Sequence, residues 1–351
     1  MKNDFTKKLL EWNRNSNFRS MPWKNETDAY RIWVSEIILQ QTRVEQGIDY
    51  YKKFITSFPT ILVLAQASEK EIFKKWEGLG YYSRCRNLIA TAKKIASEFD
   101  GSFPSSYDEL LSLPGVGPYT AAAIASFAFN KPYAVVDGNV ERVLARYFGI
   151  TTPVGSAAGK KIYNSLATEL LDKNSPGKFN QAIMDFGATV CKPRNPLCGN
   201  CNQVKHCLAF KKSWTEELPR KRMISSRKER QFYYFIIRNK TNRIWIRERI
   251  GKDIWQNLYE FILVETGQFV PHHQIHLIPY FIEHFEKKNL EIKFISQSFN
   301  QKLTHQSVTA IFVHLEGELN EFDGYQSVTR NQLRTFPFPK LIGDYLNNHI
   351  L

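Results

Sequence analysis

The chain has 351 residues, more than one hydrophobic core normally serves, so we expect two or three domains. Its hydrophobic content of 43% is ordinary for a folded protein, and no stretch approaches the ~20 apolar residues of a membrane helix. Forty-eight Lys and Arg against 34 Asp and Glu give a formal net charge of +14. Such a surface is either simply solvated or binds a polyanion such as nucleic acid. Composition therefore excludes a protein with membrane-spanning helices. The net charge favours a protein that binds nucleic acid, but charge alone does not establish this function.

The first part of the chain, residues 1–210, reads as helices joined by short loops. Its opening, MKNDFTKKLLEWNRN, lacks the apolar region of a secretory signal, so we expect a cytoplasmic protein. Ser106 and Glu109 fit a capping box for one of the helices. We find few alternating strand patterns here and predict an all-α region. Helical spacing predicts helices over residues 5–13, 29–42, 71–79, 86–99, 106–113, 120–129, 161–171 and 179–190.

The second part of the chain follows a basic linker, residues 211–230, which carries eight basic and three acidic residues. Residues 231–351 are then predicted to form an α+β domain, with a hairpin turn at Asn239-Lys240-Thr241-Asn242 and a closing helix over 341–350. A further helix is expected over 272–288. Aromatic and β-branched runs predict strands over residues 231–238, 243–248, 260–265, 290–299 and 307–318.

Four of the five cysteines crowd into one short segment, Cys191-x6-Cys198-x2-Cys201-x5-Cys207. Such crowding favours a metal site over disulfides. A structural zinc ion is the common use of four cysteines, although zinc sites more often pair two short Cys-x2-Cys knuckles. A single knuckle with wider gaps suits a larger iron–sulphur cluster. Spacing alone leaves both groups open.

A glycine-bearing turn precedes the helix predicted at residue 120, in the stretch LPGVGPYTAAAIA. Gly115 and Gly117 allow close approach of the backbone to an anion, and Pro118 suits a first helical turn. No P-loop lysine follows, and a helix rather than a strand precedes. The turn is either an ordinary corner between helices or a helix–hairpin–helix grip on a DNA phosphate.

Two carboxylates could form a catalytic pair. Glu36 lies among apolar neighbours in IWVSEIIL, and desolvation there would favour its proton-carrying form. Asp137 ends an apolar run and starts a helix. Taken alone, Glu36 is better explained by the polar stripe of an amphipathic helix, and Asp137 by a plain N-cap. Together they could divide the roles of proton donor and stabiliser of a developing cation.

In combination these motifs resemble the helix–hairpin–helix DNA glycosylase superfamily, and within it the adenine DNA glycosylases of the MutY type. The resemblance is strong from about Asp4 to Phe210 and weaker towards the C-terminus. It implies a glycosylase core with a six-helix part over about 30–134 and a cluster part over 1–29 plus 135–210. The motifs that carry it are WVSEIILQQTRV, GLGYYSRCRNL, LPGVGPYTAAAIASFAF, VVDGNVERVLAR, FNQAIMDFG and the four cysteines.

The resemblance implies a hydrolase that removes adenine mispaired with 8-oxoguanine or guanine in duplex DNA, as a bacterial, nucleoid-associated monomer without a nucleotide cofactor. Glu36 matches the general acid and Asp137 the carboxylate that stabilises the oxocarbenium-like sugar. Tyr119 matches a tyrosine that hydrogen-bonds within this site, and Asn139 a supporting polar residue. The four cysteines match the ligands of one [4Fe–4S] cluster.

Other positions carry over from the family as contacts to the base and to DNA. Trp23 and Gln181 match the lining of the adenine pocket. The usual Leu-Pro-Trp-Arg appears as Met21-Pro22-Trp23-Lys24, so a planar guanidinium is lost. Gln41 and Tyr81 match residues that enter the base stack, although Tyr81 is equally well explained as a core aromatic. The implied DNA contacts are Gln41, Thr42, Tyr81, Leu113, Gly115, Val116, Gly117 and Thr120.

The region 231–351 resembles the family's Nudix-like domain, which reads the 8-oxoguanine side of the mispair. Its usual Phe-Ser-His loop matches Leu303-Thr304-His305, so Thr304 and His305 are the expected lesion contacts. The run Arg-Glu-x2-Glu-Glu is missing from this region. We therefore expect a domain that binds rather than hydrolyses.

Two other functions compete with this one. An endonuclease III-like glycosylase/lyase shares the hairpin and the cysteine spacing, but uses a lysine where this chain has Tyr119. A tyrosine cannot form a Schiff base, so little or no lyase activity is expected. A non-catalytic DNA-binding protein would not need both Glu36 and Asp137.

Overall fold

The structure is a computed structural model that describes residues 2–221, 227–239, 242–288, 290–317, 319 and 321–349. The chain folds into two compact units. The first unit comprises Met1–Gln66 with Asn87–Ile224, and the second comprises Ala67–Arg86 with Ser225–Leu351. In the described part of the chain, no helix is long and apolar enough to cross a membrane.

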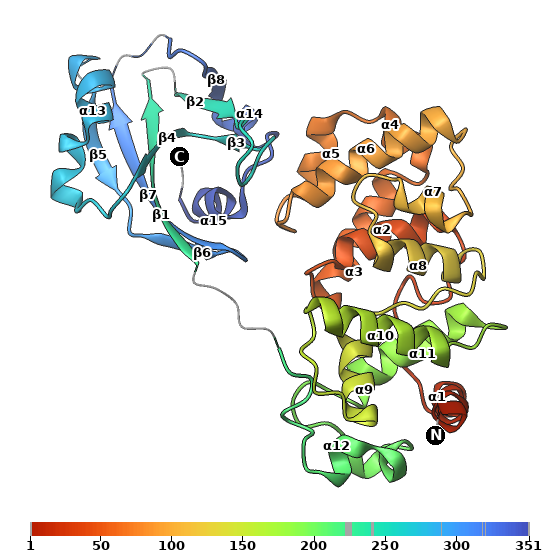
Figure 1. Ribbon diagram of the computed structural model, residues 1–351. Coiled ribbons are helices and arrows are strands. Elements are labelled where there is room, and N and C mark those ends of the chain that lie inside the picture. The colour runs from red at the N-terminus through yellow and green to blue at the C-terminus, as the bar shows by residue number, and fades with distance from the viewer. Residues whose placement is uncertain are drawn as a thin grey trace. The chain divides into compact units, whose positions relative to one another are not determined.

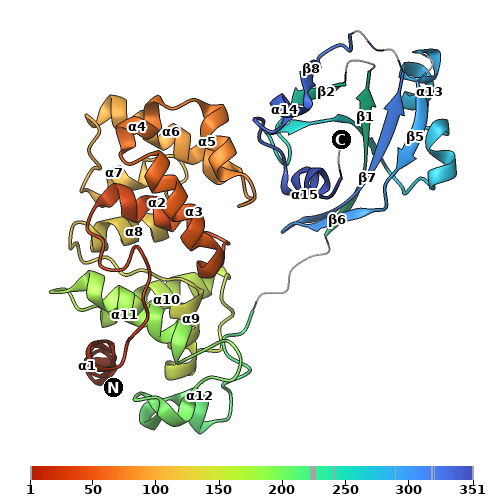
Figure 2. The ribbon, with the colours of Figure 1, turned by 180° about the vertical axis from the view of Figure 1, so that it is seen from behind.

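The first unit is helical (Figures 1 and 2). Two short 3-10 helices lie in its cysteine segment, at Cys198–Asn200 and Val204–His206. The longer helix α6 (Ser83–Glu98) begins in the second unit and continues into the first. The other helices are α1 (Lys2–Asn15), α2 (Ala29–Leu39), α3 (Val44–Ser57), α4 (Ile61–Gln66), α7 (Tyr107–Leu111), α8 (Pro118–Phe127), α9 (Gly138–Phe148), α10 (Ala157–Leu170), α11 (Pro176–Thr189) and α12 (Leu208–Lys211).

Helix α2 lies inside the helical unit rather than on its surface. Eight of its eleven residues, from Tyr30 to Ile38, are buried, and α2 packs against α3 and α8. A helix that is buried on all sides has no solvated stripe. The alternative that Glu36 occupies the polar stripe of an amphipathic helix is therefore wrong.

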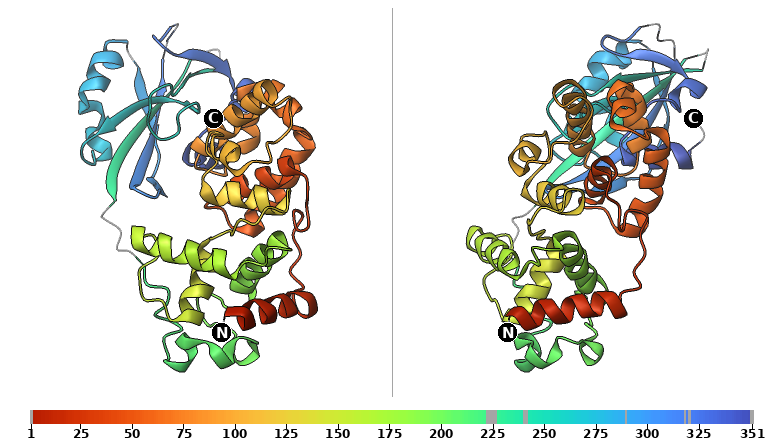
Figure 3. Two further views of the ribbon diagram at one scale, coloured as in Figure 1. Left: turned by 45° about the vertical axis from the view of Figure 1, so that its right-hand side comes forward. Right: turned by 90° about the vertical axis from the view of Figure 1, so that its right-hand side faces the viewer.

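A second core joins α1 to α9, α10 and α11. Figure 3 shows the backbone of these helices from two sides. Helix α9 begins after the N-cap Asp137 and ends before Gly149, whose φ of 65° is the left-handed C-cap conformation. These caps fix where α9 starts, and with it the position of Asp137. The core residues include Phe5, Leu9, Val143, Tyr147, Tyr163, Phe179 and Ile183.

Several local predictions for the helical region need correction. Helices α3 and α4 lie outside the predicted set. The helix predicted to reach Thr42 ends at Leu39, because Gln41 adopts a φ of 59°. The capping box is wrong as well: Ser106 is the N-cap of α7, but its side chain makes no capping hydrogen bond.

The second unit contains an eight-stranded mixed sheet with the order β3-β2-β1-β7-β5. Strands β1 and β7 run parallel in register from Lys228 opposite Gln306 to Arg238 opposite Glu316. Strand β4 also pairs with β1, β6 with β7, and β8 with β2. The strands are β1 (Lys228–Arg238), β2 (Arg243–Glu248), β3 (Tyr259–Glu260), β4 (Ile262–Thr266), β5 (Glu291–Ile295), β6 (Phe299–Lys302), β7 (Gln306–Glu316) and β8 (Gln326–Thr329).

Both faces of this sheet are covered, which explains the continuous apolar run in β1. Tyr233, Phe235 and Ile237 pack with α13 (Pro279–His284) on one face. On the other face, the ring of Phe312 stacks on Tyr345 of α15 (Lys340–Asn348), with centroids 3.7 Å apart. A short helix, α14 (Arg330–Leu333), follows β8.

The helix predicted over residues 272–288 is broken into three pieces. A 3-10 helix covers His272–Leu277, α13 begins at Pro279, and a last 3-10 turn covers Glu286–Lys288. Proline removes a backbone donor and starts a new helix instead of continuing one. The predicted turn at 239–242 lies partly outside the described residues.

The segment Ala67–Arg86, including α5 (Glu69–Trp76), belongs by its contacts to the second unit. Glu77 Oε1 accepts a hydrogen bond from the Phe338 amide at 2.9 Å, and Lys74 Nζ donates to the Phe336 carbonyl at 3.1 Å. Arg86 donates to the carbonyl of Gln256 at 3.0 Å. A part of the predicted glycosylase region is thus held by residues near the C-terminus.

Candidate active site and nucleic-acid interface

Glu36, Tyr119 and Asp137 interact although they come from three separate elements. Glu36 is 7% exposed, and burial raises its pKa from 4.5 to about 7. The negative charge of Asp137 raises this pKa further, while a hydrogen bond from the Tyr119 hydroxyl opposes the rise. Burial and the two carboxylates also raise the pKa of Tyr119, so its hydroxyl stays protonated as a donor. The group thus offers a carboxylic acid that can hold a proton near neutral pH.

Asp137 is both the N-cap of α9 and a member of this group. Its Oδ1 accepts hydrogen bonds from the amides of Asn139 at 2.9 Å and Val140 at 2.8 Å. Its Oδ2 accepts from Asn139 Nδ2 at 2.7 Å. Three donors at a helix N-terminus hold the carboxylate in one orientation. Capping and a chemical role are therefore compatible in this residue.

Arg142 connects this carboxylate to the cysteine segment. It donates to Asn139 Oδ1 at 2.8 Å and to the carbonyl of Cys191 at 2.8 Å. It also donates to the carbonyl of Gly187 at 2.8 Å. Sequence reasoning missed Arg142, although its position one turn after Gly138 on α9 marks it as a neighbour of the cap.

The four cysteines line one small cavity with apolar walls, together with Val190, Leu197 and Phe210. Arg146 also lines this cavity and donates to Cys191 Sγ at 3.4 Å and to the carbonyl of Lys192 at 2.7 Å. Among the described residues, no three side chains of metal-ligand type are placed to hold a single ion. The remaining thiol, Cys85, is buried elsewhere.

In the hairpin between α7 and α8, Gly115 has the backbone geometry expected where the chain approaches an anion closely. Gly115 has a φ of +72°, and a Cβ there would lie 2.6 Å from Asn87 Cβ. Leu113, Val116 and Thr120 are buried, so their side chains are not available to a ligand. Helix α8 begins at Pro118, and its first amides have no acceptor within the helix.

Gln41 and Tyr81 share an unusual backbone conformation. Their φ angles are 59° and 47°, values that non-glycine residues rarely adopt. Tyr81 is 45% exposed, and its hydroxyl lies 3.0 Å from Thr304 Oγ1 within the second unit. Thr304 and its neighbour His305 are exposed in the turn between β6 and β7. A residue expected in the base stack and one expected at the lesion edge are therefore in contact.

Around Trp23 and Gln181 the structure adds a residue that sequence reasoning missed. Trp23 is buried and packs edge-on against Tyr51, at 5.4 Å between ring centroids. Gln181 donates through Nε2 to Asp185 Oδ1 at 3.0 Å. Lys24, in place of the family's arginine, forms an ion pair with Asp185 at 3.1 Å. The helical i,i+4 spacing of Gln181 and Asp185 could have indicated this pair.

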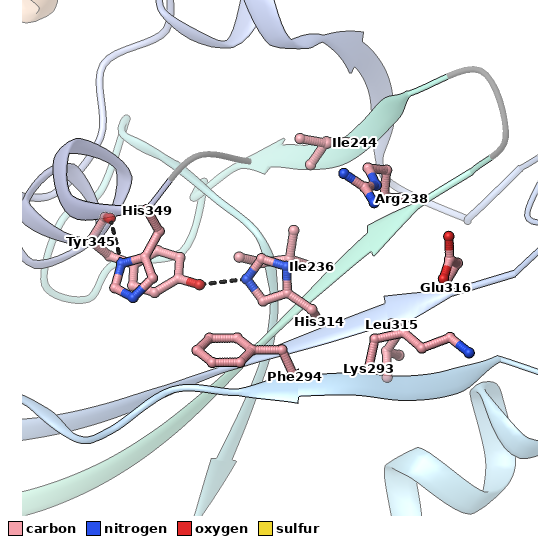
Figure 4. A pocket seen from close by; sticks show the side chains of 10 residues that line it. All are labelled: Ile236, Arg238, Ile244, Lys293, Phe294, His314, Leu315, Glu316, Tyr345 and His349. Carbon is pink, nitrogen blue, oxygen red and sulfur yellow. Dashed lines mark hydrogen bonds between the residues drawn. The ribbon is translucent and has the colours of Figure 1, made fainter.

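A second cavity lies at the end of β7 in the sheet unit (Figure 4). His314 is hydrogen-bonded to the hydroxyl of Tyr345, and burial lowers the pKa of His314 to about 4. Glu316 is the only carboxylate among the described residues that line the cavity. This lining does not provide the clustered acids of a divalent-metal hydrolase.

Comparison with known proteins places both units in families. Residues 34–166 match the HhH-GPD superfamily of base excision DNA repair proteins, and residues 233–348 match the NUDIX domain. A thermostable thymine-DNA glycosylase of known structure is similar over 60% of this chain and 97% of its own, with 30% identity and a TM-score of 0.55. An endonuclease III–DNA complex, at 20% identity and a TM-score of 0.50, covers 61% of this chain and 98% of that one and shows the shared fold alone.

A whole-chain relative gives the narrower assignment. The adenine DNA glycosylase of Buchnera aphidicola (subspecies Schizaphis graminum) is 36% identical over 310 residues, which cover 86% of this chain and 84% of the relative. This match spans both the helical unit and the sheet unit. With its helical base-excision repair core and its NUDIX domain, the chain is an enzyme of the adenine DNA glycosylase family.

Proposed function

We propose that the enzyme hydrolyses the N-glycosidic bond of adenine mispaired with 8-oxoguanine or guanine in duplex DNA. The single observation that carries this proposal is the buried Glu36, whose pKa is raised to about 7 beside the carboxylate of Asp137. A general acid is most effective when its pKa lies near the working pH. The family assignment supplies adenine as the base.

In the proposed reaction, Glu36 gives its proton to a ring nitrogen of the extruded adenine. The bond between C1′ and the base then breaks, and its electron pair leaves with the base. Asp137, held by the amides at the start of α9, stabilises the positive charge that develops on the sugar. Water adds to C1′, and the proton it releases restores the acid.

Tyr119 supports a reaction without strand cleavage. It occupies the position where a lyase would place its lysine, and it is hydrogen-bonded to Glu36. A phenol cannot form an imine with the sugar. We therefore propose a monofunctional enzyme, against the endonuclease III-like alternative.

We further propose that the DNA is held at three places. The hairpin at Gly115 and Gly117 binds a phosphate through backbone amides at the start of α8. Gln41 and Tyr81, on tight turns with positive φ, enter the base stack. Thr304, in contact with Tyr81, and His305 meet the 8-oxoguanine edge.

The cysteine cavity fits one [4Fe–4S] cluster, with Cys191, Cys198, Cys201 and Cys207 as its ligands. Four thiols on one apolar cavity and an N–H donor from Arg146 to a sulphur support this assignment. The cluster would order the surrounding loop for DNA and would take no part in the hydrolysis. An absorption shoulder near roughly 400 nm, lost in a Cys198→Ser variant, is the expected signature.

The proposal is tested with two duplexes, one carrying adenine opposite 8-oxoguanine and one carrying thymine glycol opposite adenine. After incubation, strand breaks are compared with and without alkali. We expect breaks only after alkali, and only on the adenine strand of the first duplex. Breaks without alkali, or breaks at thymine glycol, would replace this proposal with the lyase.

A further inference from the structure

Asp185 is a fully buried carboxylate in the middle of α11, with four side-chain donors around it. Its Oδ1 accepts from Arg19 at 2.8 Å and from Gln181 Nε2 at 3.0 Å. Its Oδ2 accepts from Asn17 at 2.8 Å and pairs with Lys24 Nζ at 3.1 Å. A buried negative charge is costly unless cations and hydrogen-bond donors surround it, as the two cations and two amides do here. The arrangement satisfies both oxygens.

This network fixes which way round the Gln181 amide lies. An ionised carboxylate only accepts hydrogen bonds, so only the NH₂ end of the amide can face Asp185. The amide is planar, and its Oε1 therefore points away from Asp185. Gln181 is partly exposed, so Oε1 is available as an acceptor. The opposite orientation would set two acceptors against each other in a buried place.

We propose that Asp185 is a positioning residue that sets base specificity: by fixing Gln181, it makes the pocket present an acceptor to the extruded base. An acceptor pairs with the exocyclic amine of adenine, which is a donor, and opposes the 6-oxo group of hypoxanthine or guanine. The inference rests on the proposed function, and it assumes in addition that Gln181 lines the adenine pocket, as the family resemblance implies. It adds a physical reason why the enzyme would excise adenine in preference to a 6-oxo purine.

A purely structural role for Asp185 makes a different prediction. Through Asn17, Arg19 and Lys24, Asp185 also ties the chain before α2 to α11. If that were its only task, its loss would slow the excision of every base alike. A change in the ratio between two bases therefore separates the two roles.

The experiment measures single-turnover excision of adenine and of hypoxanthine, each placed opposite 8-oxoguanine. In Asp185→Asn the neighbour of Gln181 can donate as well as accept, so the Gln181 amide is free to turn over. We expect the ratio of adenine to hypoxanthine rates to fall about tenfold, the worth of one mismatched buried hydrogen bond. Asp49→Asn, on the exposed side of α3, is the matched control and should keep the wild-type ratio.

The double variant Asp185→Asn with Gln181→Glu exchanges the two groups. The amide introduced at position 185 then donates to a carboxylate at position 181, which again presents only acceptors, so the ratio should return to the wild-type value or above it. If Asp185→Asn alone folds poorly, the ratio measured in this double variant still tests the inference. Thermal unfolding and binding to an uncleavable duplex confirm that each variant is folded.

The possible outcomes separate the inference from the function on which it rests. An unchanged ratio in folded Asp185→Asn, or equal loss of both rates without recovery in the exchange variant, overturns the inference while leaving the proposed function intact. If the wild-type enzyme itself does not release adenine opposite 8-oxoguanine, the proposed function fails instead.

Discussion

Replacing Glu36 by glutamine should abolish catalysis and at the same time stabilise the protein at alkaline pH. In the unfolded chain this carboxyl ionises near its ordinary pKa of 4.5, whereas its pKa in the folded chain is about 7. Between these values the unfolded chain releases a proton that the folded chain keeps. The contribution of Glu36 to the stability of the wild-type protein is therefore present in full below pH 4.5 and is lost as the pH rises through 7.

The size of this effect follows from the two pKa values. Each pKa unit corresponds to ~1.4 kcal/mol, so between about pH 5 and pH 8.5 the wild-type protein loses about 2–3 kcal/mol of unfolding free energy through Glu36. A glutamine has the same shape and no charge, and it avoids this loss. The advantage of Glu36→Gln over the wild type should therefore grow by about 2–3 kcal/mol across that range.

Two measurements check this prediction together. Urea unfolding, followed by tryptophan fluorescence at several pH values, gives the difference between variant and wild type. In the wild type, single-turnover excision should fall roughly tenfold per pH unit above about pH 7. Below pH 7, where Glu36 holds its proton, the variant should be slower than the wild type by a factor of about 10² or more, and the gap should narrow as the pH rises. Glu11→Gln, at an exposed position of α1, is the control and should show a difference that does not vary with pH. A constant difference for Glu36→Gln would refute the idea that this carboxyl is desolvated.

Three further changes probe other parts of the site. Asp137→Asn keeps a good N-cap residue, so we expect duplex binding to persist while base release falls about 10²-fold or more; full excision activity would contradict the proposed role. Tyr119→Lys should introduce some strand cleavage, and the lack of a borohydride-trapped adduct would argue against the match of positions. Gly115→Ala forces a side chain into a φ of +72° and against Asn87, so it should destabilise the protein by about 1 kcal/mol or more and weaken duplex binding; an unchanged melting temperature would be inconsistent with that turn.

Much of the helical region could be predicted from the sequence because its information is local. The 3.6-residue spacing indicates α1, α6 and α11, and the apolar surroundings of Glu36 foretell its desolvation. Pro279 carries enough information to predict the break in the helix over 272–288, although the apolar spacing continues across it. Local sequence patterns thus predict that a helix exists more reliably than they predict the residues at which it begins and ends.

Other features depend on contacts that no local pattern contains. The hydrogen bond between Glu36 and Tyr119 requires α2 to pack against α8. Three of the four partners of Asp185, namely Asn17, Arg19 and Lys24, lie before α2 and far away in the chain, so the residues around MDFG do not indicate its role. The parallel pairing of β1 with β7 is likewise a long-range choice. The roles of the site residues follow from the family resemblance. The residues that hold them in place are set by tertiary packing and cannot be predicted from local sequence.

The contacts of segment Ala67–Arg86 set a limit on how this enzyme can be cut or recombined. Glu77 and Lys74 bond to the backbone of residues 338 and 336, and Tyr81 reaches Thr304. A chain shortened after the linker would lose these three contacts. A chimera that takes its C-terminal domain from a relative would have to bring that relative's version of this segment with it, or lose the support of the turn that carries Tyr81.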